Sequence, residues 1–233
     1  MMAGIVAGGR PLTTGSAVVP TDGLIAWYKL DSISGGVLTD ETGVHSGTVT
    51  NASLVAGKIG SAIQCNGATT LGSIPHSPAL DCAAFTLSVW VKFTGTQNLV
   101  IAEKNGNSGW SIQTMSDALV SSFGGPSGQV MINSGGITSS LLSGASVNNG
   151  QWRHIAAVVD YAGGINKFYV DGSLTSPSSG LGSSVSGVPT YISGPLSIGQ
   201  RPTNLGPFAG AIDNIRYYNR ALSAAEVLQL FNE

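Results

Sequence analysis

Hydrophobic and polar residues alternate most clearly along the ten residues before position 94. Every second residue from 85 to 93 is large and apolar, which places these side chains on one face of an extended chain. They are Phe85, Leu87, Val89, Val91 and Phe93. Thr86, Ser88, Trp90 and Lys92 fall on the opposite face. The alternation predicts a β-strand with one face against the core.

Other short runs rich in β-branched and aromatic residues are separated by clusters of Gly, Asn and Ser. They span residues 24–30, 61–65, 99–103, 110–114, 154–160, 167–171, 196–199 and 211–218. The pair Asp171 and Gly172 is typical of a tight hairpin turn. Residues 116–150 and 173–195 are rich in Ser and Gly, and we expect strands with long loops there. Many short strands of this kind predict an all-β sandwich.

One helix is predicted, at the C-terminal end. Ser223 can cap it, and Glu226 three residues later completes a capping box. Leu222 and Val227 flank the cap and can form a hydrophobic staple. Val227, Leu230 and Phe231 share a helical face. We expect a short helix docked on the sandwich.

Residues 1–22 differ from the rest of the chain. Gly, Thr, Ala and Pro dominate this segment, and it has no periodic apolar face. We expect an extended N-terminal arm here and a single domain over residues 23–233. The segment lacks the basic and long apolar regions of a secretory signal. No stretch of about 18 apolar residues occurs, so no membrane span is expected.

Composition supports this interpretation. Only 9% of the 233 residues are charged, the net charge is −2, and there are 33 glycines. A chain with so few charged residues has few side chains suited to the solvent-exposed faces of helices. No basic run is available to neutralise phosphates, so nucleic-acid binding is not expected. Cys65 and Cys82 do not make a disulfide framework, and we interpret them as buried free thiols.

Several segments together resemble the laminin-G-like, concanavalin A-like lectin/glucanase family. They are GLIAWYKLD at 23–31, DETG at 40–43, GKIGSAIQCNG at 57–67, IPHSPALD at 74–81, FTLSVWVK at 85–92, WRHIAAVVD at 152–160, FYVDG at 168–172 and FAGAIDNIRYYNRALSAAE at 208–226. The resemblance implies two packed antiparallel sheets with jelly-roll connections. It does not fix a function, because this fold carries lectins, glycosidases, adhesion modules and virion proteins.

The chain lacks the carboxylates that glycosidases of this fold use. Those enzymes are expected to carry Glu-x-Asp-x-x-Glu on one strand, and no glutamate of this chain has that spacing. No Gly-x-Ser-x-Gly motif occurs, and His45, His76 and His154 are scattered along the sequence. We interpret His154, in an apolar strand, as a hydrogen-bonded core histidine. No catalytic residue is predicted.

The resemblance also implies a calcium site between an early loop and the last long strand. By this resemblance the ligands are Asp40 and Asp213, with carbonyl groups near Gly43 and His45, and Ca²⁺ is the cofactor considered. The loop departs from the family pattern, because residues 43–47 are shorter and lack two asparagines. The alternative is that Asp40 caps a turn and that Asp213 pairs with Arg216 or a backbone amide.

Sugar binding would need an exposed aromatic side chain. Trp27, Trp90 and Trp152 lie in family-like strands, where core packing is expected. Trp110 follows the Asn- and Gly-rich residues 105–109 and is the best candidate for a ligand platform among the four, although core packing is favoured for it as well.

Two functions follow from these features. The first is a non-catalytic component of a bacteriophage virion surface, a capsid decoration or fibre protein. It would be a homo-oligomer whose arm, residues 1–22, contacts the major capsid protein. The alternative is a calcium-dependent carbohydrate-binding or adhesion module with a glycan partner, located outside the cell or on its surface.

Overall fold

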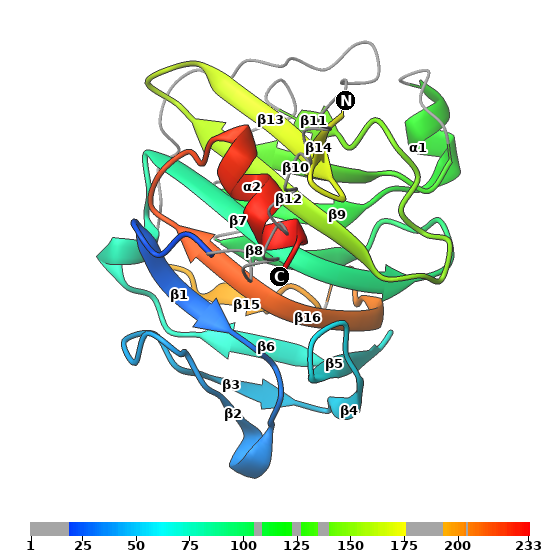
Figure 1. Ribbon diagram of the computed structural model, residues 1–233. Helices are drawn as coiled ribbons and strands as arrows, with labels where there is room; N and C mark the ends of the chain where they lie inside the picture. The colour runs from blue at the N-terminus through cyan, green and yellow to red at the C-terminus, as the bar shows by residue number, and fades with distance from the viewer. Residues whose placement is uncertain (1–18, 105–108, 123–126, 135–139, 176–192, 204) are drawn as a thin grey trace, which may run out of the picture.

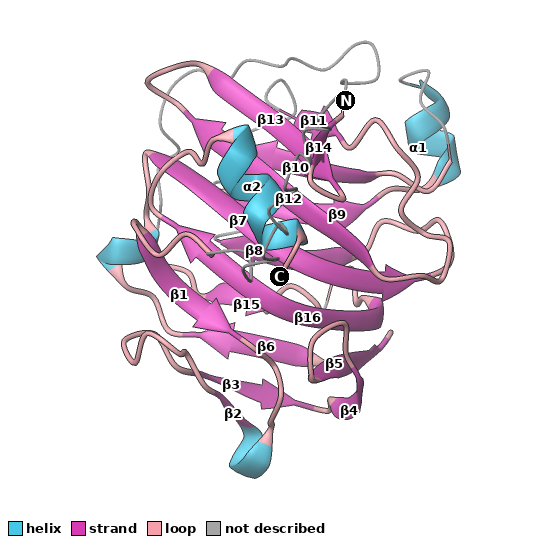
Figure 2. Ribbon diagram, in the orientation of Figure 1, coloured by secondary structure: helices cyan, strands magenta, loops and turns pink. Residues whose placement is uncertain are grey.

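A computed structural model of the protein describes residues 19–104, 109–122, 127–134, 140–175, 193–203 and 205–233 (Figure 1). The described strands form two antiparallel eight-stranded sheets packed as a sandwich (Figure 2). The predicted all-β, two-sheet jelly-roll class is therefore confirmed.

The first sheet, which we call sheet A, contains the two longest strands. In the order of their hydrogen bonding, its strands are β14 (Ser173–Leu174), β13 (Ile165–Val170), β12 (Arg153–Asp160), β7 (Ala84–Phe93), β16 (Ala209–Tyr218), β5 (Ser61–Asn66) and β4 (Ser53–Ala56). Strand β1 (Leu24–Tyr28) also pairs with β16. Strands β7 and β16, far apart in sequence, are thus neighbours at the centre of the sheet.

The second sheet, sheet B, lies behind sheet A in Figure 1. Its strands in order are β11 (Ser140–Leu142), β10 (Val130–Ser134), β9 (Trp110–Thr114), β8 (Val100–Lys104), β15 (Leu196–Ile198), β6 (Leu71–Ile74), β3 (Gly47–Thr50) and β2 (Val37–Leu38). Two short 3₁₀ turns, η1 (Ser34–Gly36) and η2 (Pro78–Leu80), lie in the connections.

The predicted alternation in β7 is confirmed. The five large apolar residues at alternate positions from 85 to 93 all belong to the buried core between the sheets. Lys92 of the opposite set is exposed, whereas Trp90 is 2% exposed because other residues cover it on the outer face. The core is therefore built by period-two burial, as in other sandwiches.

The predicted C-terminal helix, α2 (Ala224–Phe231), lies across the outer face of sheet A (Figure 2). Its capping box is formed by Ser223 and Glu226 as predicted. The two staple residues at 222 and 227 belong to one buried cluster with Tyr169 and Tyr218. The ring of Phe231 stacks on Trp90 with centroids 5.7 Å apart. The helix thus covers apolar surface that the sheet leaves on its outer side.

The hairpin turn expected at Asp171 and Gly172 is present. Asp171 (φ 49°) and Gly172 (φ 73°) both adopt the left-handed conformation of a tight hairpin turn between β13 and β14.

A six-residue helix, α1 (Asp117–Ser122), lies within the segment expected to hold strands and loops. It is too short for a helical period to be visible in the sequence. Val120 of α1 packs against Met131 and Leu142 on the outer face of sheet B.

The described end of the predicted arm packs on the domain. Val19 contacts the cluster beneath α2. The hydroxyl of Tyr218 donates a hydrogen bond to the carbonyl of Pro20 over 2.9 Å, and Arg220 pairs with Asp22. The rest of the arm, residues 1–18, lies outside the described residues.

Two other expectations concern buried groups and the membrane. Cys65 and Cys82 are buried free thiols, as expected. Burial raises the pKa of Cys65 to about 12. Among the described residues, no helix is both long and apolar enough to cross a membrane.

Candidate functional site

Trp110 is not a ligand platform. Its side chain is fully buried and faces the core from β9, so the ligand-platform candidate is wrong and the favoured core interpretation is correct. The indole stacks on Phe85 with centroids 5.3 Å apart, and its Nε1–H donates to the hydroxyl of Tyr217 over 3.1 Å. Alternation within β9 turns Trp110 inward together with Ile112.

The carboxylate of Asp40, a predicted calcium ligand, accepts hydrogen bonds from the turn that it begins. Its Oδ1 accepts hydrogen bonds from the backbone amides of Trp27 (2.8 Å) and Thr42 (3.0 Å). Its Oδ2 accepts from the hydroxyl of Thr42 (2.6 Å) and from the amides of Val44 (3.2 Å) and His45 (2.8 Å). Burial alone would raise the pKa of Asp40, but these hydrogen bonds together lower it. This carboxylate does not fit a metal site, because its oxygens are already satisfied.

The other predicted ligands of the early loop serve the same turn. The amide of Gly43 donates to the carbonyl of Asp40 over 2.9 Å, and Gly43 has a φ of 80°, which suits glycine. The carbonyl of His45 accepts a hydrogen bond from the hydroxyl of Tyr28 over 2.7 Å. Asp40 therefore caps a turn, which was the alternative interpretation.

Asp213 has a separate set of partners. It lies on β16, and its Oδ2 accepts from the amides of Lys58 (2.8 Å) and Ile59 (3.0 Å). Burial raises the pKa of Asp213 to about 6, further raised by Asp31 and opposed by hydrogen bonds from the backbone. Within the described residues, no group of three or more His, Cys, Asp or Glu side chains could hold a metal ion. Asp40 and Asp213 thus accept hydrogen bonds from different turns, Asp40 from residues 42–45 and Asp213 from residues 58–59.

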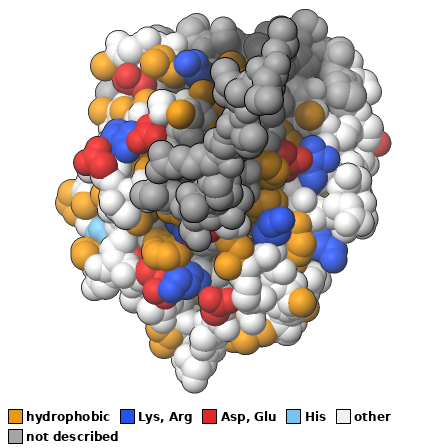
Figure 3. All heavy atoms as spheres, viewed as in Figure 1, with side chains coloured by type: hydrophobic (Ala, Val, Ile, Leu, Met, Phe, Trp, Pro, Cys, Tyr) orange, Lys and Arg blue, Asp and Glu red, His pale blue; other side chains and the backbone are white. Residues whose placement is uncertain are grey.

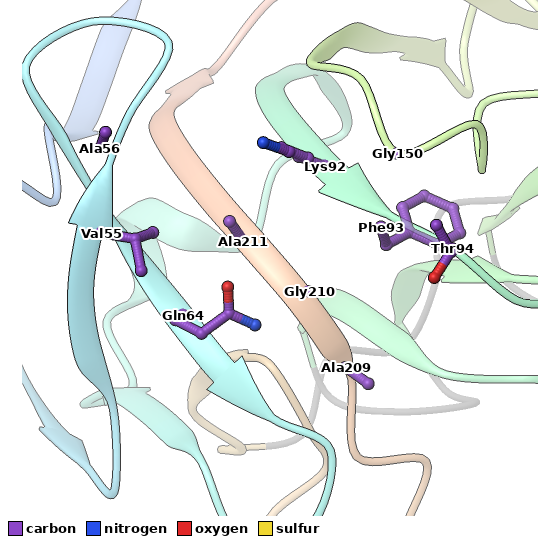
Figure 4. A pocket seen from close by; sticks show the side chains of 10 residues that line it. All are labelled: Val55, Ala56, Gln64, Lys92, Phe93, Thr94, Gly150, Ala209, Gly210 and Ala211. Carbon is purple, nitrogen blue, oxygen red and sulfur yellow. The ribbon is translucent and has the colours of Figure 1, made fainter.

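An open groove of about 640 Å³ crosses the outer face of sheet A over β4, β5, β16 and β7 (Figure 4). Its lining residues are Val55, Ala56, Gln64, Lys92, Phe93, Thr94, Gly150, Ala209, Gly210 and Ala211. Lys92 carries the one charged side chain among them. The volume lies within the range of small-molecule sites, about 300 to 1,000 Å³.

Strand register explains why the groove forms where it does. Ala211 of β16 is paired with Lys92 of β7 on one side and with Gln64 of β5 on the other. Gln64 is in turn paired with Ser53 of β4. The four side chains form a row across the sheet, and the small methyl group of Ala211 leaves a hollow between two long polar neighbours. Figure 4 shows Lys92 and Gln64 on either side of β16 with Ala211 between them.

Two glycines at the edge of the groove let neighbouring residues lie close to the backbone. A Cβ on Gly210 would lie 2.7 Å from the Cβ of Phe93 and 2.8 Å from the carbonyl oxygen of Lys92. Gly150 borders the groove from the loop before β12 (Figure 4). A side chain at position 210 would press on Phe93 and Phe208 of the core beneath the groove, and one at position 150 would lie against Thr94.

Two of the three tryptophans expected in the core are partly exposed on the same outer face, whereas Trp90 is buried beneath Phe231 of α2. Trp27 is partly exposed between Lys29 and Arg216, whose cationic groups lie 4.7 and 4.4 Å from its ring centroid. Trp152 is also partly exposed. Arg153 is paired with Val91, so continuing this register by one residue places Trp152 level with Lys92.

Charges on this face are sparse. In Figure 3, red and blue side chains on its described part lie singly or beside each other among white and orange ones. The described part of this face shows no basic patch of the kind that binds nucleic acid.

Residues 66–228 match the family model described as the concanavalin A-like lectin/glucanases superfamily, of the laminin-G type. This is more than half of the chain. The protein belongs to this lectin/glucanase family. Among curated proteins, none matches the chain significantly.

Solved structures with the same fold include domain 4 of AbnA, a GH43 extracellular arabinanase from Geobacillus stearothermophilus, in complex with arabinotriose. It is 24% identical with a TM-score of 0.64, and the match covers 89% of this chain and 97% of that one. A Trypanosoma rangeli sialidase is 19% identical with a TM-score of 0.69, over 97% of this chain and 35% of the sialidase. The binding domain of Paraclostridial Mosquitocidal Protein 1 is 18% identical with a TM-score of 0.68, over 90% and 52%. The chain thus spans about a third of the sialidase and half of the mosquitocidal binding domain.

The glutamates, which carry catalysis in the glucanases of this lectin/glucanase family, are held apart here by separate ion pairs. Glu41 pairs with Lys29, Glu103 with Arg201, Glu226 with Arg220 and Glu233 with Arg216. Each of these four glutamates is thus held by a basic side chain.

The sequence could not identify Lys92, Gln64 and Ala211 as one group. Alternation placed Lys92 on the outer face, but the groove depends on which residues β16 sets beside it. That pairing joins positions more than a hundred residues apart and has no local sequence signal.

Proposed function

We propose that the protein is a non-catalytic carbohydrate-binding module and that a glycan binds in the groove over β4, β5, β16 and β7. The observation that carries this proposal is the row of Lys92, Ala211 and Gln64. Two long side chains with hydrogen-bonding ends flank a small apolar one on an open sheet surface.

The groove has the chemical character that a sugar ring requires. Lys92 donates, and Gln64 and Thr94 each donate and accept, so they can bind hydroxyl groups. Val55, Ala209 and Ala211 supply apolar surface for the C–H face of a ring. A mostly apolar hollow with a few polar groups is the usual form of a small-ligand site.

Trp152 would extend this surface at the Lys92 end. A partly exposed indole offers a flat ring with one polar edge, which suits a ligand that is apolar on one side and wet on the other. Its position next to Lys92 makes it the aromatic residue that we propose contacts the glycan.

The comparisons support a binding role in general terms. The AbnA domain was solved with arabinotriose, and the mosquitocidal fragment is called a binding domain. At identities below 25% these structures support the fold, and the proposal rests on this chain's own groove. The separate ion pairs of the four glutamates support a role without catalysis.

The experiment is a glycan-array screen followed by calorimetric titration of the best ligand. We expect Lys92→Ala and Gln64→Ala each to weaken binding about tenfold, as expected for a lost hydrogen bond of about 1.4 kcal/mol. Ala211→Leu should abolish binding by filling the hollow. Lys167→Ala, at an exposed lysine on β13 of the same sheet, and Ala225→Leu on α2 are the controls.

Two results would overturn this proposal. One is the absence of binding to any glycan on the array by the wild-type protein. The other is a bound glycan whose affinity is unchanged in all three groove variants, which would place its site elsewhere. Turnover of the bound glycan would contradict the non-catalytic part.

The virion-surface role is our second proposal. Its favouring observation is that residues 19–22 are fixed beside α2 and β16, through Val19, Pro20 and Asp22. A preceding segment would therefore leave the domain from a defined point and could bind a capsid protein, in a homo-oligomer or singly. Deleting residues 1–18 should abolish attachment to phage particles, and attachment of the truncated protein would contradict the role.

A further inference from the structure

Arg216 and Asn214 of β16 hold the carboxylate of Glu233, which follows α2 on the outer face of sheet A. The two terminal nitrogens of Arg216 lie 2.5 and 2.6 Å from the two oxygens of this carboxylate. The side-chain amide of Asn214 donates a third hydrogen bond to it over 3.2 Å. A bidentate arginine is the side chain that proteins favour where a carboxylate must be recognised.

Trp27 holds both donors in place without help from Glu233. Its Nε1–H donates to Oδ1 of Asn214 over 2.6 Å, so the NH₂ group of the same amide is the part that faces the carboxylate. The guanidinium carbon of Arg216 lies 4.4 Å from the centroid of the Trp27 ring, in a cation–π contact. We therefore expect both donors to keep their positions when the glutamate leaves.

The backbone of β16 is irregular at the residue that supplies the amide donor. The pairing of β16 with β7 shifts register between Asp213 and Arg216, and Asn214 has a φ of 51°. Bulges of this kind re-aim side chains beside functional sites. A residue other than glycine seldom adopts a positive φ, and such residues cluster where ligands bind. The strand thus gives up regular pairing where it presents Asn214.

Glu233 does not satisfy every donor of the arginine. Arg216 is 1% exposed, and its Nε has no hydrogen-bond partner among the residues that the structure describes. A buried donor without an acceptor costs free energy. A glutamate side chain has only methylene groups beside its carboxylate, so it offers no acceptor there. A ligand with an oxygen on the carbon next to its carboxylate would offer one.

The carboxylate of Glu233 can leave without unfolding α2. The amide of Asn232 donates to the carbonyl of Leu228 and closes the last turn of the helix before Glu233. The side chain of Glu233 is 23% exposed, whereas that of Arg216 is 2% exposed. Rotation of the backbone after Asn232 would therefore release the carboxylate and open the arginine to solvent.

We propose that Arg216, Asn214 and Trp27 form a binding site for a carboxylate with an oxygen on the adjacent carbon, as in a uronic acid, and that Glu233 occupies this site until the ligand displaces it. In a uronic acid the ring oxygen is bonded to the carbon that carries the carboxylate. The sugar nature of the ligand rests on the proposed function, because site and groove share the outer face of sheet A. The carboxylate does not, since it follows from the donors alone.

Glu233 is then a competitor tethered to its own site. A group on a short flexible linker has an effective concentration on the order of millimolar, so it weakens the apparent affinity of a free ligand. Removing the glutamate side chain should therefore strengthen binding, whereas removing an ordinary structural residue would not.

The test is calorimetric titration of the full chain and of Glu233→Ala with three probes. They are sodium glucuronate, glucose, which lacks the carboxylate, and sodium acetate, which lacks the adjacent oxygen. We expect Glu233→Ala to bind glucuronate about tenfold more tightly than the wild type does. Acetate should bind more weakly than glucuronate, and glucose should not distinguish the two proteins. Asn232→Ala, at the exposed neighbouring residue, is the control and should behave as the wild type.

Two further variants, made in the Glu233→Ala protein, locate the ligand. Asn214→Gly removes one donor and suits the positive φ, so it should fold and weaken glucuronate binding about tenfold. Arg216→Gln should abolish binding, and Asn214→Gly keeps the test available if Arg216→Gln does not fold. Glucuronate should also raise the unfolding midpoint of Glu233→Ala, because it pairs the buried guanidinium, and equal sodium chloride should not.

Three results would overturn the proposal. They are no saturable binding of glucuronate by Glu233→Ala, equal affinity in Glu233→Ala and the wild type, and affinity unchanged by Asn214→Gly. Acetate binding as tight as that of glucuronate would overturn the part played by the adjacent oxygen. Lys92→Ala and Gln64→Ala alter the groove and not this site, so failure of the groove proposal leaves the glucuronate result intact.

Discussion

Ser88 Oγ and His154 Nε2 lie 2.8 Å apart on the neighbouring strands β7 and β12, on the outer face of sheet A. The pair is enclosed: His154 is fully buried, and the rings of Trp90 and Phe231 lie 5.1 and 6.1 Å from its own. A serine beside a histidine is also the arrangement of a nucleophile and its base. Here α2 covers it, so it binds strand to strand, as the hydrogen-bonded core histidine predicted from the sequence.

The burial of His154 makes stability depend on pH. Burial first, and the charge of Arg216 second, lower the pKa of His154 from 6.5 to about 3. As pH falls below about 6.5 the unfolded chain gains a proton on this histidine, whereas the folded protein does not until about pH 3. Stability is thus full above pH 6.5 and is lost toward pH 3, by roughly 4 kcal/mol from this group.

Urea unfolding between pH 7 and pH 4 measures this loss. His154→Gln, which cannot take up a proton, should be less stable at pH 7 but should show a flatter decline. Ser121→Ala, at an exposed serine that carries no titratable group, is the control and should decline as the wild type does. Equal slopes for His154→Gln and the wild type would contradict the assignment.

Substitutions at Trp110 and at Trp152 should affect different quantities, the first stability and the second glycan affinity. Trp110 fills the core between Phe85 and Tyr217, so Trp110→Ala should cost about 3 to 5 kcal/mol of unfolding free energy. Trp110→Phe should cost less and leave glycan affinity unchanged. Trp152→Ala should do the reverse, with affinity reduced and stability nearly kept. Denaturant unfolding and titration of each variant check this, and reduced affinity in Trp110→Phe would contradict the correction.

The features that the sequence predicted correctly have local causes. The burial of β7 follows from side chains that alternate along one strand. The start of α2 follows from Ser223 and Glu226, three residues apart, and the turn at Asp171 follows from adjacent residues that tolerate a positive φ. Each depends on neighbours within a few positions.

Features that depend on long-range pairing were missed or misassigned. The groove requires Ala211 beside Lys92 and Gln64. The family pattern suggested a metal ligand at Asp40. The turn at residues 40–45 had lost two asparagines, and the shorter loop closes on the carboxylate with its own amides. Nothing local in the sequence shows that closure.

The N-terminal cap of α2 should contribute measurably to the free energy of unfolding. The hydroxyl oxygen of Ser223 accepts a hydrogen bond from the amide of Glu226, and the carboxylate of Glu226 accepts one from the amide of Ser223. Ser223→Ala should lower the unfolding free energy by about 1 kcal/mol. Ser121→Ala, at an exposed serine of α1, serves as the control in the same urea titration. A loss in the control as large as in Ser223→Ala would argue against a specific cap.

Asp40 gives the sharpest contrast between a structural and a metal-binding carboxylate. Its five hydrogen bonds tie β1 to the turn at residues 40–45, and the amide of His45 is buried with it. Asp40→Asn keeps the shape but points an NH₂ group at amide donors, so at least one donor loses its acceptor. We expect a loss of about 2 to 3 kcal/mol of unfolding free energy.

That loss should be the same in calcium and in a chelator, because Asp40 has no free oxygen for an ion. We expect the unfolding midpoint of Asp40→Asn to lie equally far below that of the wild type in calcium and in a chelator. Paired thermal scans of Asp40→Asn and the wild type in both buffers measure this. A larger gap in calcium than in the chelator would show that an ion binds at the early loop that the family pattern suggested, and that the turn must open to receive it.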